Sequence, residues 1–385
     1  MSAVVRDRMS AERIEVPPGL AGVVVAETAL GDVRGLEGFY HYRQYSAVEL
    51  ARTRTVEEVW RLLLDGDLPD SSTAHAFSLE VRRQREIPDA VAAALPAVAR
   101  TTAGADPLAG LRSALPMLAG STGIRPLLDI DESQRRQDAL AIGASVPTLL
   151  TALWRLGLGQ QVVAPRTDLD HAGNYLWMLA GTEPSPEAVR AVNAYLVAAI
   201  DHGFNASTFT ARVVASTGAD LGAAVSAAVG SLSGPLHGGA PSRALELLEL
   251  GSAERAVAYV RDQVAAGDRI MGFGHAVYRT EDPRSALMKE IALGFGGPRV
   301  ELAVEIEAAI LATLDELKPG RALHTNLEYY AAVVMEAAGI PPAMFTATFA
   351  VARVLGWTAH VLEQARLGKI IRPAARYVGP EPVGP

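Results

Sequence analysis

Apolar residues recur at helical spacing along most of the chain beyond residue 54. This period indicates amphipathic α-helices that each bury one face. Thr55 followed three residues later by Glu58 is a capping signature, and it marks the start of the first such helix. The helices expected from the pattern are 55–64, 78–85, 89–99, 106–117, 134–156, 171–179, 187–200, 207–214, 221–231, 242–250, 252–266, 300–317, 329–338, 341–355 and 356–367.

Only the stretch 20–45 has the character of β-structure. Its runs 23–25 and 39–42 are rich in valine and aromatic residues, and glycine-containing turn signals separate them. We therefore expect a short N-terminal hairpin on an otherwise all-α protein. Within the long helix 134–156, Pro147 predicts a kink or break near Ser145, because proline lacks the N–H that a helix interior needs.

Composition limits the classes of function. A chain of 385 residues, 49% of them apolar, builds one large domain or two smaller ones. Its net charge of −8 argues against nucleic acid or an anionic membrane as the partner. The absence of cysteine excludes disulfides, thiol catalysis and cysteine-based zinc sites, and it fits a cytoplasmic location. No apolar run reaches the roughly 20 residues of a membrane span. The charged segment 1–14 reads as a flexible arm and not as a secretory signal.

The first candidate for chemistry is His237, in Ser-Gly-Pro-Leu-His-Gly-Gly-Ala ahead of the helix 242–250. The glycines allow a ligand or another backbone to approach closely. A helix N-terminus disfavours the imidazolium form, so a neutral imidazole would donate a hydrogen bond there. The alternative is a turn histidine that only satisfies loop backbone.

A second imidazole, His275, follows in Gly-Phe-Gly-His-Ala-Val-Tyr-Arg, with Arg279 and Arg284 close behind it. The planar guanidinium fork suits carboxylates, so this stretch is a candidate anion site. A surface network of ion pairs is the alternative for these arginines.

Glu328 lies in Asn-Leu-Glu-Tyr-Tyr at the start of an apolar helix. A carboxylate at such an edge tends to have a raised pKa and can act as a general base. It can also simply complement the helix dipole.

Lone charges mark two further positions. Arg353 is the single charge within the apolar run 349–357, and a buried guanidinium needs an anion, either a protein carboxylate or a ligand. Arg372 is a similar lone charge near the C-terminus. His202 lies in a break between helices, where it contacts a ligand or, like its neighbours, caps a helix end. A metal site made of histidines alone matches no known ligand spacing.

Taken in this order, the motifs resemble the citrate synthase family. The resemblance runs from about residue 19 to residue 380. Its most specific parts are Gly-Pro-Leu-His-Gly-Gly-Ala followed by Gly-Phe-Gly-His-Ala-Val-Tyr-Arg-x-x-Asp-Pro-Arg. It implies a multi-helical, two-domain fold in a homodimer. The large domain would comprise 19–226 and 329–385, the small domain 227–328, and residues 1–18 a flexible arm.

The resemblance also implies roles for individual residues. Glu328 would take a proton from the acetyl group of acetyl-CoA, and His237 would hydrogen-bond the thioester oxygen. His275 would polarise the ketone of oxaloacetate. The remaining binding residues would be His202, Arg284 and Arg353, with Arg372 from the second subunit and Arg279 near the CoA phosphates. No metal and no cofactor besides the acyl-CoA substrate is implied, and the reaction is that of the tricarboxylic acid cycle.

Two features leave the function open. The family's base is usually aspartate, and Glu328 is longer by one methylene group, which shifts the carboxylate by about 1 Å. Acetyl-CoA and propionyl-CoA differ by one methyl group, which is worth only about 1–3 kcal/mol in an apolar pocket. The alternatives are therefore a 2-methylcitrate synthase and a catalytically weak relative that binds oxaloacetate or CoA.

Overall fold

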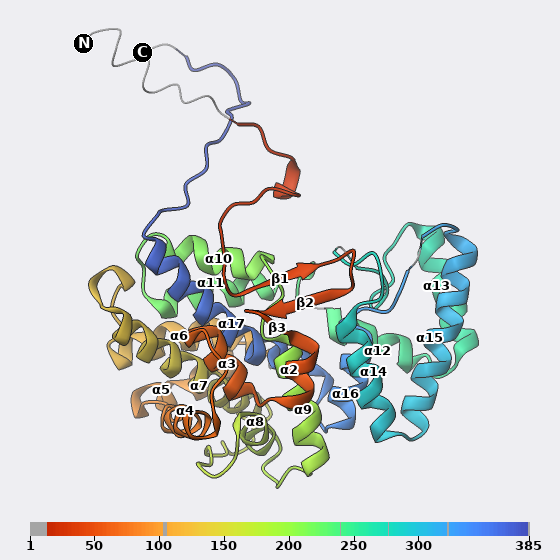
Figure 1. The fold of residues 1–385 in the computed structure, drawn as a ribbon. Coiled ribbons are helices and arrows are strands. Elements are labelled where there is room, and N and C mark those ends of the chain that lie inside the picture. The colour runs from red at the N-terminus through yellow and green to blue at the C-terminus, as the bar shows by residue number, and fades with distance from the viewer. Residues whose placement is uncertain (1–13, 103–105, 239, 276, 322, 384–385) are drawn as a thin grey trace.

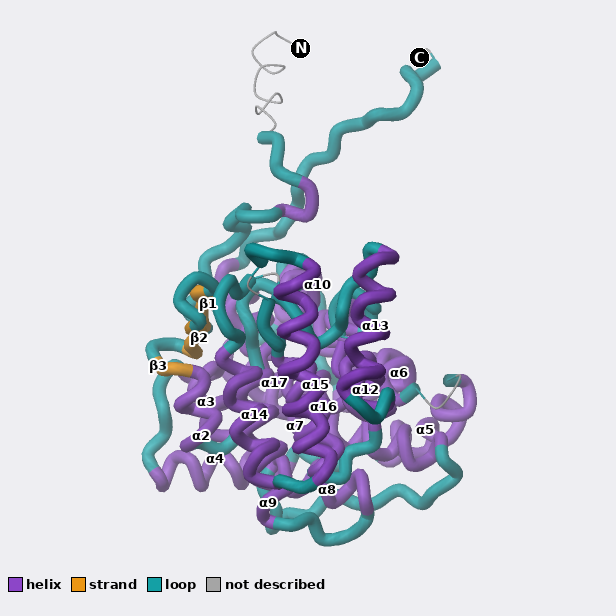
Figure 2. Tube along the Cα trace, turned by 90° about the vertical axis from the view of Figure 1, so that its right-hand side faces the viewer, coloured by secondary structure: helices purple, strands orange, loops and turns teal. Residues whose placement is uncertain are grey.

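The computed structural model describes residues 14–383 except 103–105, 239, 276 and 322. Helices make up nearly all of the body and the strands lie at one edge (Figure 1, Figure 2), so the predicted all-α class is confirmed. The helices are α2 (Ala47–Thr53), α3 (Val56–Asp65), α4 (Ser71–Arg83), α5 (Asp89–Thr101), α6 (Pro107–Thr122), α7 (Glu132–Gly157), α8 (His171–Ala180), α9 (Pro186–Ala199), α10 (Ala206–Ala215), α11 (Leu221–Leu232), α12 (Ala240–Glu249), α13 (Ala253–Ala266), α14 (Pro283–Phe295), α15 (Pro298–Leu317), α16 (Leu327–Ala337) and α17 (Phe345–Leu367).

The small sheet has three antiparallel strands in the order β1 (Gly31–Arg34), β2 (Phe39–Tyr42) and β3 (Tyr45–Ser46). The strand expected at 39–42 is present. The other strand was placed wrongly, because residues 23–25 form no strand and β1 begins at Gly31, in a stretch where a turn was expected. The reason is that cross-strand packing decides which residues pair. Tyr40 and Tyr42 of β2 are buried, whereas Val24 is 86% exposed.

Helix α17 lies in the core and is buried along almost its whole length. It packs against α3, α7, α9, α10 and α11. The sequence pattern predicted two helices here, divided at Gly356, and this prediction was wrong. Gly356 does not end the helix; it lets the helix approach the backbone at the end of α9, because a Cβ at this position would lie 2.1 Å from the carbonyl oxygen of Ile200.

Helix α7 runs through Pro147 without the predicted break. The residues around Pro147 are buried on all sides, and packing holds the helix although one backbone hydrogen bond is missing. Two helices were not expected at all, α2 and α14. The second has a clear start signal in Asp282-Pro283, since Asp282 accepts the N–H of Arg284 and proline occupies the first helical position.

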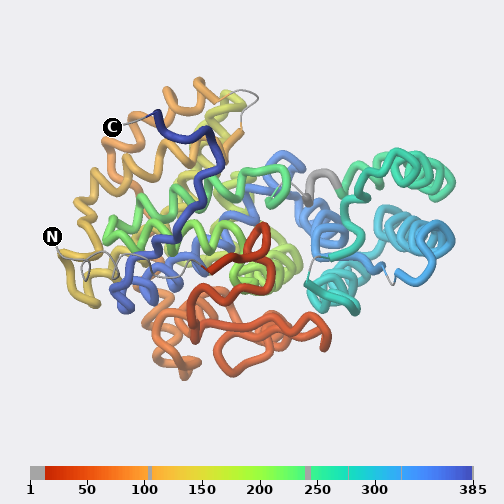
Figure 3. Tube along the Cα trace, turned by 90° about the horizontal axis from the view of Figure 1, so that it is seen from above, coloured from red at the N-terminus to blue at the C-terminus, as the bar shows by residue number. Residues whose placement is uncertain are grey.

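Viewed from above, α12 to α15 gather at one end of the molecule and α5 and α6 at the other (Figure 3). The division into a small domain at 227–328 and a large domain stays a prediction. Both end segments leave the body on the same side (Figure 1), where Glu15 forms an ion pair with Arg376. The greater part of the predicted arm, residues 1–13, lies outside the described residues.

Among the described residues, two helical stretches are long and apolar enough to cross a membrane, contrary to the expectation from sequence. They are α7 and the stretch 342–367 that contains α17. Their most apolar windows are 78% and 94% buried inside the molecule, which is the environment of core helices.

The close approach at Gly356 predicts a specific loss of stability. In Gly356→Ala the new methyl group would meet the Ile200 carbonyl, so we expect a loss of about 2–3 kcal/mol of unfolding free energy. Gly294→Ala is the matched control, because its Cβ meets nothing within 4 Å. That variant should gain about 0.5–1 kcal/mol from reduced chain entropy. Denaturant unfolding measures both, and equal stability of the two variants would contradict this account.

Candidate active site

His237 lies in the turn that follows α11. Its backbone N–H donates to the carbonyl of Gly234 at 2.9 Å, and Gly238 packs so closely on Leu232 that a Cβ would lie 2.3 Å from its carbonyl oxygen. Nε2 of His237 lies 2.7 Å from Oγ of Ser207, in the first turn of α10. Burial, with a smaller effect of Arg353, lowers the pKa of His237 to about 4. The imidazole is therefore neutral at pH 7, as the sequence predicted.

His275 is held by the backbone that follows it. The N–H groups of Val277 and Tyr278 both approach its Nδ1, at 2.9 and 3.1 Å. A backbone N–H can only donate, so Nδ1 is the acceptor and the neutral ring carries its proton on Nε2. Burial, together with the charge of Arg284, lowers the pKa of His275 to about 4 and keeps the ring neutral.

Arg284 forms a buried ion pair with Asp282. Its Nε and Nη2 donate to the two carboxylate oxygens at 3.0 and 2.8 Å, and its backbone N–H donates to Oδ1 at 3.0 Å. Burial works against the charge, but the Asp282 carboxylate holds the pKa of Arg284 above its ordinary value. Nη2 also lies 3.1 Å from Nε2 of His275. Because Nδ1 already accepts, the Nε2–H of His275 and the guanidinium N–H are two donors in contact, and an oxygen acceptor bound by both would relieve their repulsion.

The start of α16 is joined to the segment that carries His275. Asn326 caps the helix by accepting the N–H of Glu328 at 3.1 Å, and its Nδ2 donates to the carbonyl of Gly274 at 2.9 Å. Its own N–H donates to Gly272 at 2.9 Å. Glu328 and His275, far apart in sequence, are thus parts of one hydrogen-bonded unit. A second bond strengthens it, because Asp282 accepts the N–H of the first helical residue, 327, at 3.1 Å.

Glu328 occupies the first turn of α16, where its Oε2 is shut off from solvent and has no hydrogen-bond partner in the described part of the chain. Burial raises the pKa of this carboxyl group above its ordinary value, although Arg284 and Arg353 act in the opposite direction. Its position at the start of a helix and its raised pKa agree with the sequence analysis, and its role as a general base stays a prediction.

Arg353 lies in the interior of α17 and is 3% exposed. Its Nε and Nη1 are buried and find no hydrogen-bond partner in residues 14–383 as far as these are described, and its guanidinium stacks on Phe349 at 4.7 Å from the ring centroid. Burial lowers its pKa, and the carboxylate of Asp201 only partly offsets this effect. Among the described residues Arg353 forms no ion pair with a carboxylate. Of the two alternatives from sequence, a ligand anion fits this arrangement better.

His202 lies in the break between α9 and α10. Asn205, not His202, caps α10, by accepting the N–H of Thr208 at 3.1 Å. Nε2 of His202 lies 2.9 Å from the hydroxyl of Tyr278, and its ring meets the ring of His275 edge-on with centroids 5.6 Å apart. Burial and the two nearby guanidinium groups lower the pKa of His202 well below its ordinary value.

The charges of Arg284 and Arg353 show how these segments converge. Arg353 affects the pKa of His202, His237 and Glu328, and Arg284 affects the pKa of His202, His275 and Glu328. The structure therefore brings together six of the predicted site residues. These are His202, His237, His275, Arg284, Glu328 and Arg353.

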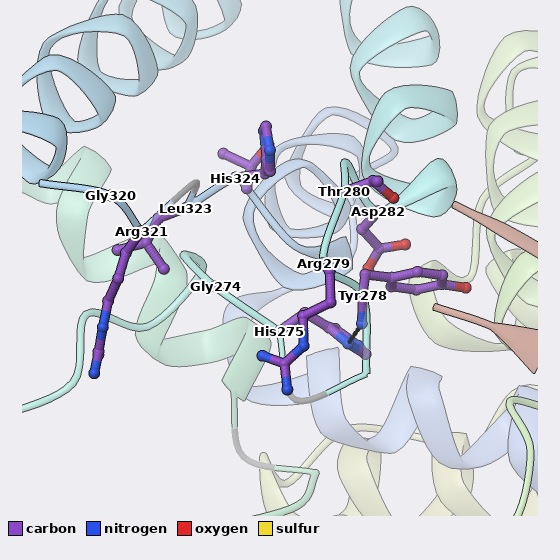
Figure 4. A pocket seen from close by; sticks show the side chains of 11 residues that line it. Gly274, His275, Tyr278, Arg279, Thr280, Asp282, Gly320, Arg321, Leu323 and His324 are labelled. Carbon is purple, nitrogen blue, oxygen red and sulfur yellow. Dashed lines mark hydrogen bonds between the residues drawn. The ribbon is translucent and has the colours of Figure 1, made fainter. Parts of the chain in front are cut away.

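Beside His275 lies a cavity of about 600 Å³. Arg279, predicted from sequence, lines it together with Arg321 and His324 from the segment before α16, and the close-up shows the two arginines entering from separate segments (Figure 4). Both arginine side chains are exposed. Sequence reasoning missed Arg321, because a single arginine in a Pro-Gly turn carries no pattern.

Arg372 is not part of this arrangement in the single chain. It is exposed in the segment after α17, where the neighbouring Ile371 donates its N–H to Ser216 at 3.0 Å. Its proposed role from a second subunit stays a prediction. Within the described part of the chain, no group of three or more His, Asp or Glu side chains is arranged to hold a metal ion.

With this geometry established, the chain can be compared with known proteins. The family profile "Citrate synthase, C-terminal domain" matches residues 19–374. A Mycobacterium tuberculosis protein named "Putative citrate synthase 2" is 41% identical over 375 residues, covering 96% of this chain and 94% of that protein. The citrate synthase of Deinococcus radiodurans is 35% identical over 371 residues, covering 94% and 96%.

Solved structures that resemble this chain are also citrate synthases. Citrate synthase from Thermotoga maritima superposes with a TM-score of 0.83 at 33% identity, covering 96% of this chain and 98% of that one. Citrate synthase from Thermoplasma acidophilum, solved in a ternary complex with carboxymethyl coenzyme A and oxaloacetate, superposes with a TM-score of 0.87 at 28% identity and the same coverage.

The burial of Glu328 predicts how stability depends on pH. Because its pKa is higher in the folded protein than in the unfolded chain, the folded state binds the proton more tightly, and stability falls as pH rises from the ordinary glutamate pKa through the raised one. Glu328→Gln cannot titrate, so at pH 8 it should be more stable than the wild type, by on the order of 1 kcal/mol.

Denaturant unfolding at a series of pH values measures this difference, which should disappear toward pH 4. Glu305→Gln, on the exposed face of α15, is the control and should change stability little at any pH. If the stability advantage of Glu328→Gln over the wild type stays constant from pH 4 to pH 8, the assignment is contradicted.

Proposed function

Because the chain belongs to the citrate synthase family of acyl-transferring enzymes, we propose that it condenses acetyl-CoA with oxaloacetate and hydrolyses citryl-CoA to citrate and CoA. This is the entry reaction of the tricarboxylic acid cycle. The observation that carries the proposal is a pair of buried guanidinium groups, Arg284 and Arg353, facing neutral imidazoles and one raised-pKa carboxyl group. These groups together suit two substrates. One is a keto-diacid, and the other is a thioester with an acidic C–H bond.

Oxaloacetate would supply the carboxylates that balance the charges of Arg284 and Arg353. Arg353 offers two buried donors without protein partners to one carboxylate. The Nε2–H of His275 and the Nη2–H of Arg284 lie side by side and would share the ketone or the second carboxylate. His202 adds a donor from the other side of the site. A hydrogen-bonded ketone carries more positive character at carbon, which prepares it for attack.

Glu328 would then remove a proton from the acetyl methyl group. Its raised pKa makes it a stronger base than an exposed carboxylate, and His237 stabilises the enol by donating to the thioester oxygen. The hydroxyl of Ser207 lies 2.7 Å from both Nε2 of His237 and Oδ1 of Asn205. Because Oδ1 can only accept, the hydroxyl donates to Asn205. It would have to turn to Nε2 for the imidazole proton to lie on Nδ1 and be available to the thioester.

The cavity beside His275 is suited to the rest of CoA. Arg279 and Arg321 line it, and within the described residues neither guanidinium has a carboxylate partner. They are free to neutralise phosphate groups. We propose that the enzyme needs no metal and no cofactor beyond the CoA substrate.

Replacing the Glu328 carboxylate tests whether this residue is the base. We expect the wild type to release CoA from acetyl-CoA only when oxaloacetate is present, and Glu328→Gln to lower kcat at least about 100-fold. Glu328→Asp should also lose activity, because the shorter side chain withdraws the carboxylate by about 1 Å. A thiol reagent reports CoA directly, since the protein has no cysteine.

The same assay with propionyl-CoA decides between citrate and 2-methylcitrate. We expect a higher kcat/KM with acetyl-CoA, and a clear preference for propionyl-CoA would assign the enzyme to 2-methylcitrate synthesis. Equal rates for the wild type and Glu328→Gln would remove Glu328 from the base role. No release from the wild type with either thioester would favour a binding protein without turnover.

A homodimer would complete the site. The end segments carry exposed apolar side chains that a second copy could cover. These are Ile14, Val16, Val24, Ile370, Tyr377 and Val378. Arg372 lies exposed in the C-terminal segment, and we propose that it enters the site of the neighbouring subunit.

We therefore expect a dimer in sedimentation velocity. Arg372→Ala should remain dimeric but raise the KM for oxaloacetate about tenfold, the effect of losing one hydrogen bond to a charged group. Arg376→Ala is the control, because Arg376 is already paired with Glu15 on exposed chain, and its kinetics should be unchanged. A fully active monomer would contradict a site shared between subunits.

A further inference from the structure

Tyr278 is in contact with both imidazoles of the proposed keto-acid site. It is 4% exposed and lies three residues beyond His275. Its backbone N–H donates to Nδ1 of His275 at 3.1 Å, and its ring lies 4.8 Å from the His275 ring, centroid to centroid. Its hydroxyl lies 2.9 Å from Nε2 of His202. One residue therefore touches His275 with its backbone and ring, and His202 with its hydroxyl.

The bond to His202 connects two parts of the chain that lie far apart in sequence. His202 belongs to the break between α9 and α10, and Tyr278 to the segment before α14. Among the described residues, this is the only hydrogen bond between the stretches 200–210 and 270–284. The phenol group therefore adds a directional hydrogen bond to the edge-on contact of the two imidazole rings. Arg284 also lies against the Tyr278 ring, 5.9 Å from its centroid, which brings the third proposed ligand of oxaloacetate to the same side chain.

The direction of the bond decides what His202 can do. Burial raises the pKa of the Tyr278 hydroxyl, so it stays protonated and has one proton to give. If it donates to Nε2, the neutral His202 ring carries its own proton on Nδ1 and can offer that proton to a carboxylate or ketone oxygen. If it accepted instead, Nδ1 would present a lone pair, which repels an anionic ligand.

We propose that Tyr278 is a positioning residue for the keto-acid: its hydroxyl donates to His202 and fixes the tautomer and orientation in which that imidazole acts beside His275. This role rests on the proposed function, because the ligand is oxaloacetate. In this role Tyr278 acts on the keto-acid through the two imidazoles and not through its own contact with the reacting atoms. Its backbone N–H fixes the proton of His275 on Nε2, and its hydroxyl fixes the proton of His202 on Nδ1. Both rings are thereby ready to donate to one small anion.

Removing the hydroxyl alone tests the role. In Tyr278→Phe we expect the KM and the calorimetric Kd for oxaloacetate to rise about tenfold, the typical effect of one buried hydrogen bond. The KM for acetyl-CoA at saturating oxaloacetate and the melting temperature should stay close to the wild-type values. Tyr175→Phe is the matched control, since it removes another buried hydroxyl, bonded to Thr348 at 2.7 Å, and should leave oxaloacetate binding unchanged.

A double-mutant cycle shows whether the hydroxyl acts through His202. In a His202→Ala background, Tyr278→Phe should change the Kd for oxaloacetate less than about twofold, because its partner is gone. Nitrogen-15 NMR of the His202 ring should show Nδ1 protonated in the wild type and a mixture of tautomers in Tyr278→Phe. Both readouts are insensitive to a role in packing alone.

Two results would overturn the inference. Wild-type affinity in Tyr278→Phe, with loss only in Tyr278→Leu, would show that the ring packs and the hydroxyl does nothing. An equal loss with and without His202 would show that the hydroxyl acts on another group. Both differ from failure of the proposed function, in which the wild type itself neither binds oxaloacetate nor releases CoA.

Discussion

The structure depends on keeping two guanidinium groups charged in a dry interior. Arg284 is stabilised by a carboxylate of the protein itself, in a two-pronged ion pair with Asp282. Arg353 has no such partner among the described residues, and its buried donors have a large desolvation cost unless an anion binds. The rest of the site follows from this difference. Arg284 is paired within the protein, whereas Arg353 needs a bound anion.

The two guanidinium groups also affect the protonation states of the ionisable side chains around them. Burial and nearby guanidinium groups together disfavour protonation of His202, His237 and His275, so the three imidazoles are neutral and each has one N–H to donate. Glu328 experiences opposing effects, since burial favours its neutral form and the arginines favour its charged form. A keto-diacid adds negative charge near Glu328 and partly cancels the arginines. Binding of the first substrate would thus strengthen the base that the second substrate needs.

Sequence motifs identified the residues that carry charge, because a lone arginine in an apolar helix or an imidazole between glycines stands out locally. They could not show which partner each residue has. The bridge from Asn326 to Gly274 and the contact of Tyr278 with His202 join positions more than 50 residues apart, and no period or propensity encodes them. The same limit explains the error at Gly356, which has the local pattern of a helix end but serves a contact with the end of α9.

The glutamate at position 328 can be understood from the hydrogen bonds around it. The start of α16 is fixed by the cap from Asn326 and by the bond from Leu327 to Asp282, so the backbone has little freedom to withdraw and make room for a longer side chain. The extra methylene group must therefore be accommodated by the side-chain rotamer or by the position of the acyl group. Because the carboxylate reaches further from the helix than an aspartate would, the proton it removes must lie further from the helix as well. The acyl pocket, and not the charge of the base, is then the part of the site in which this chain should differ most from relatives with aspartate.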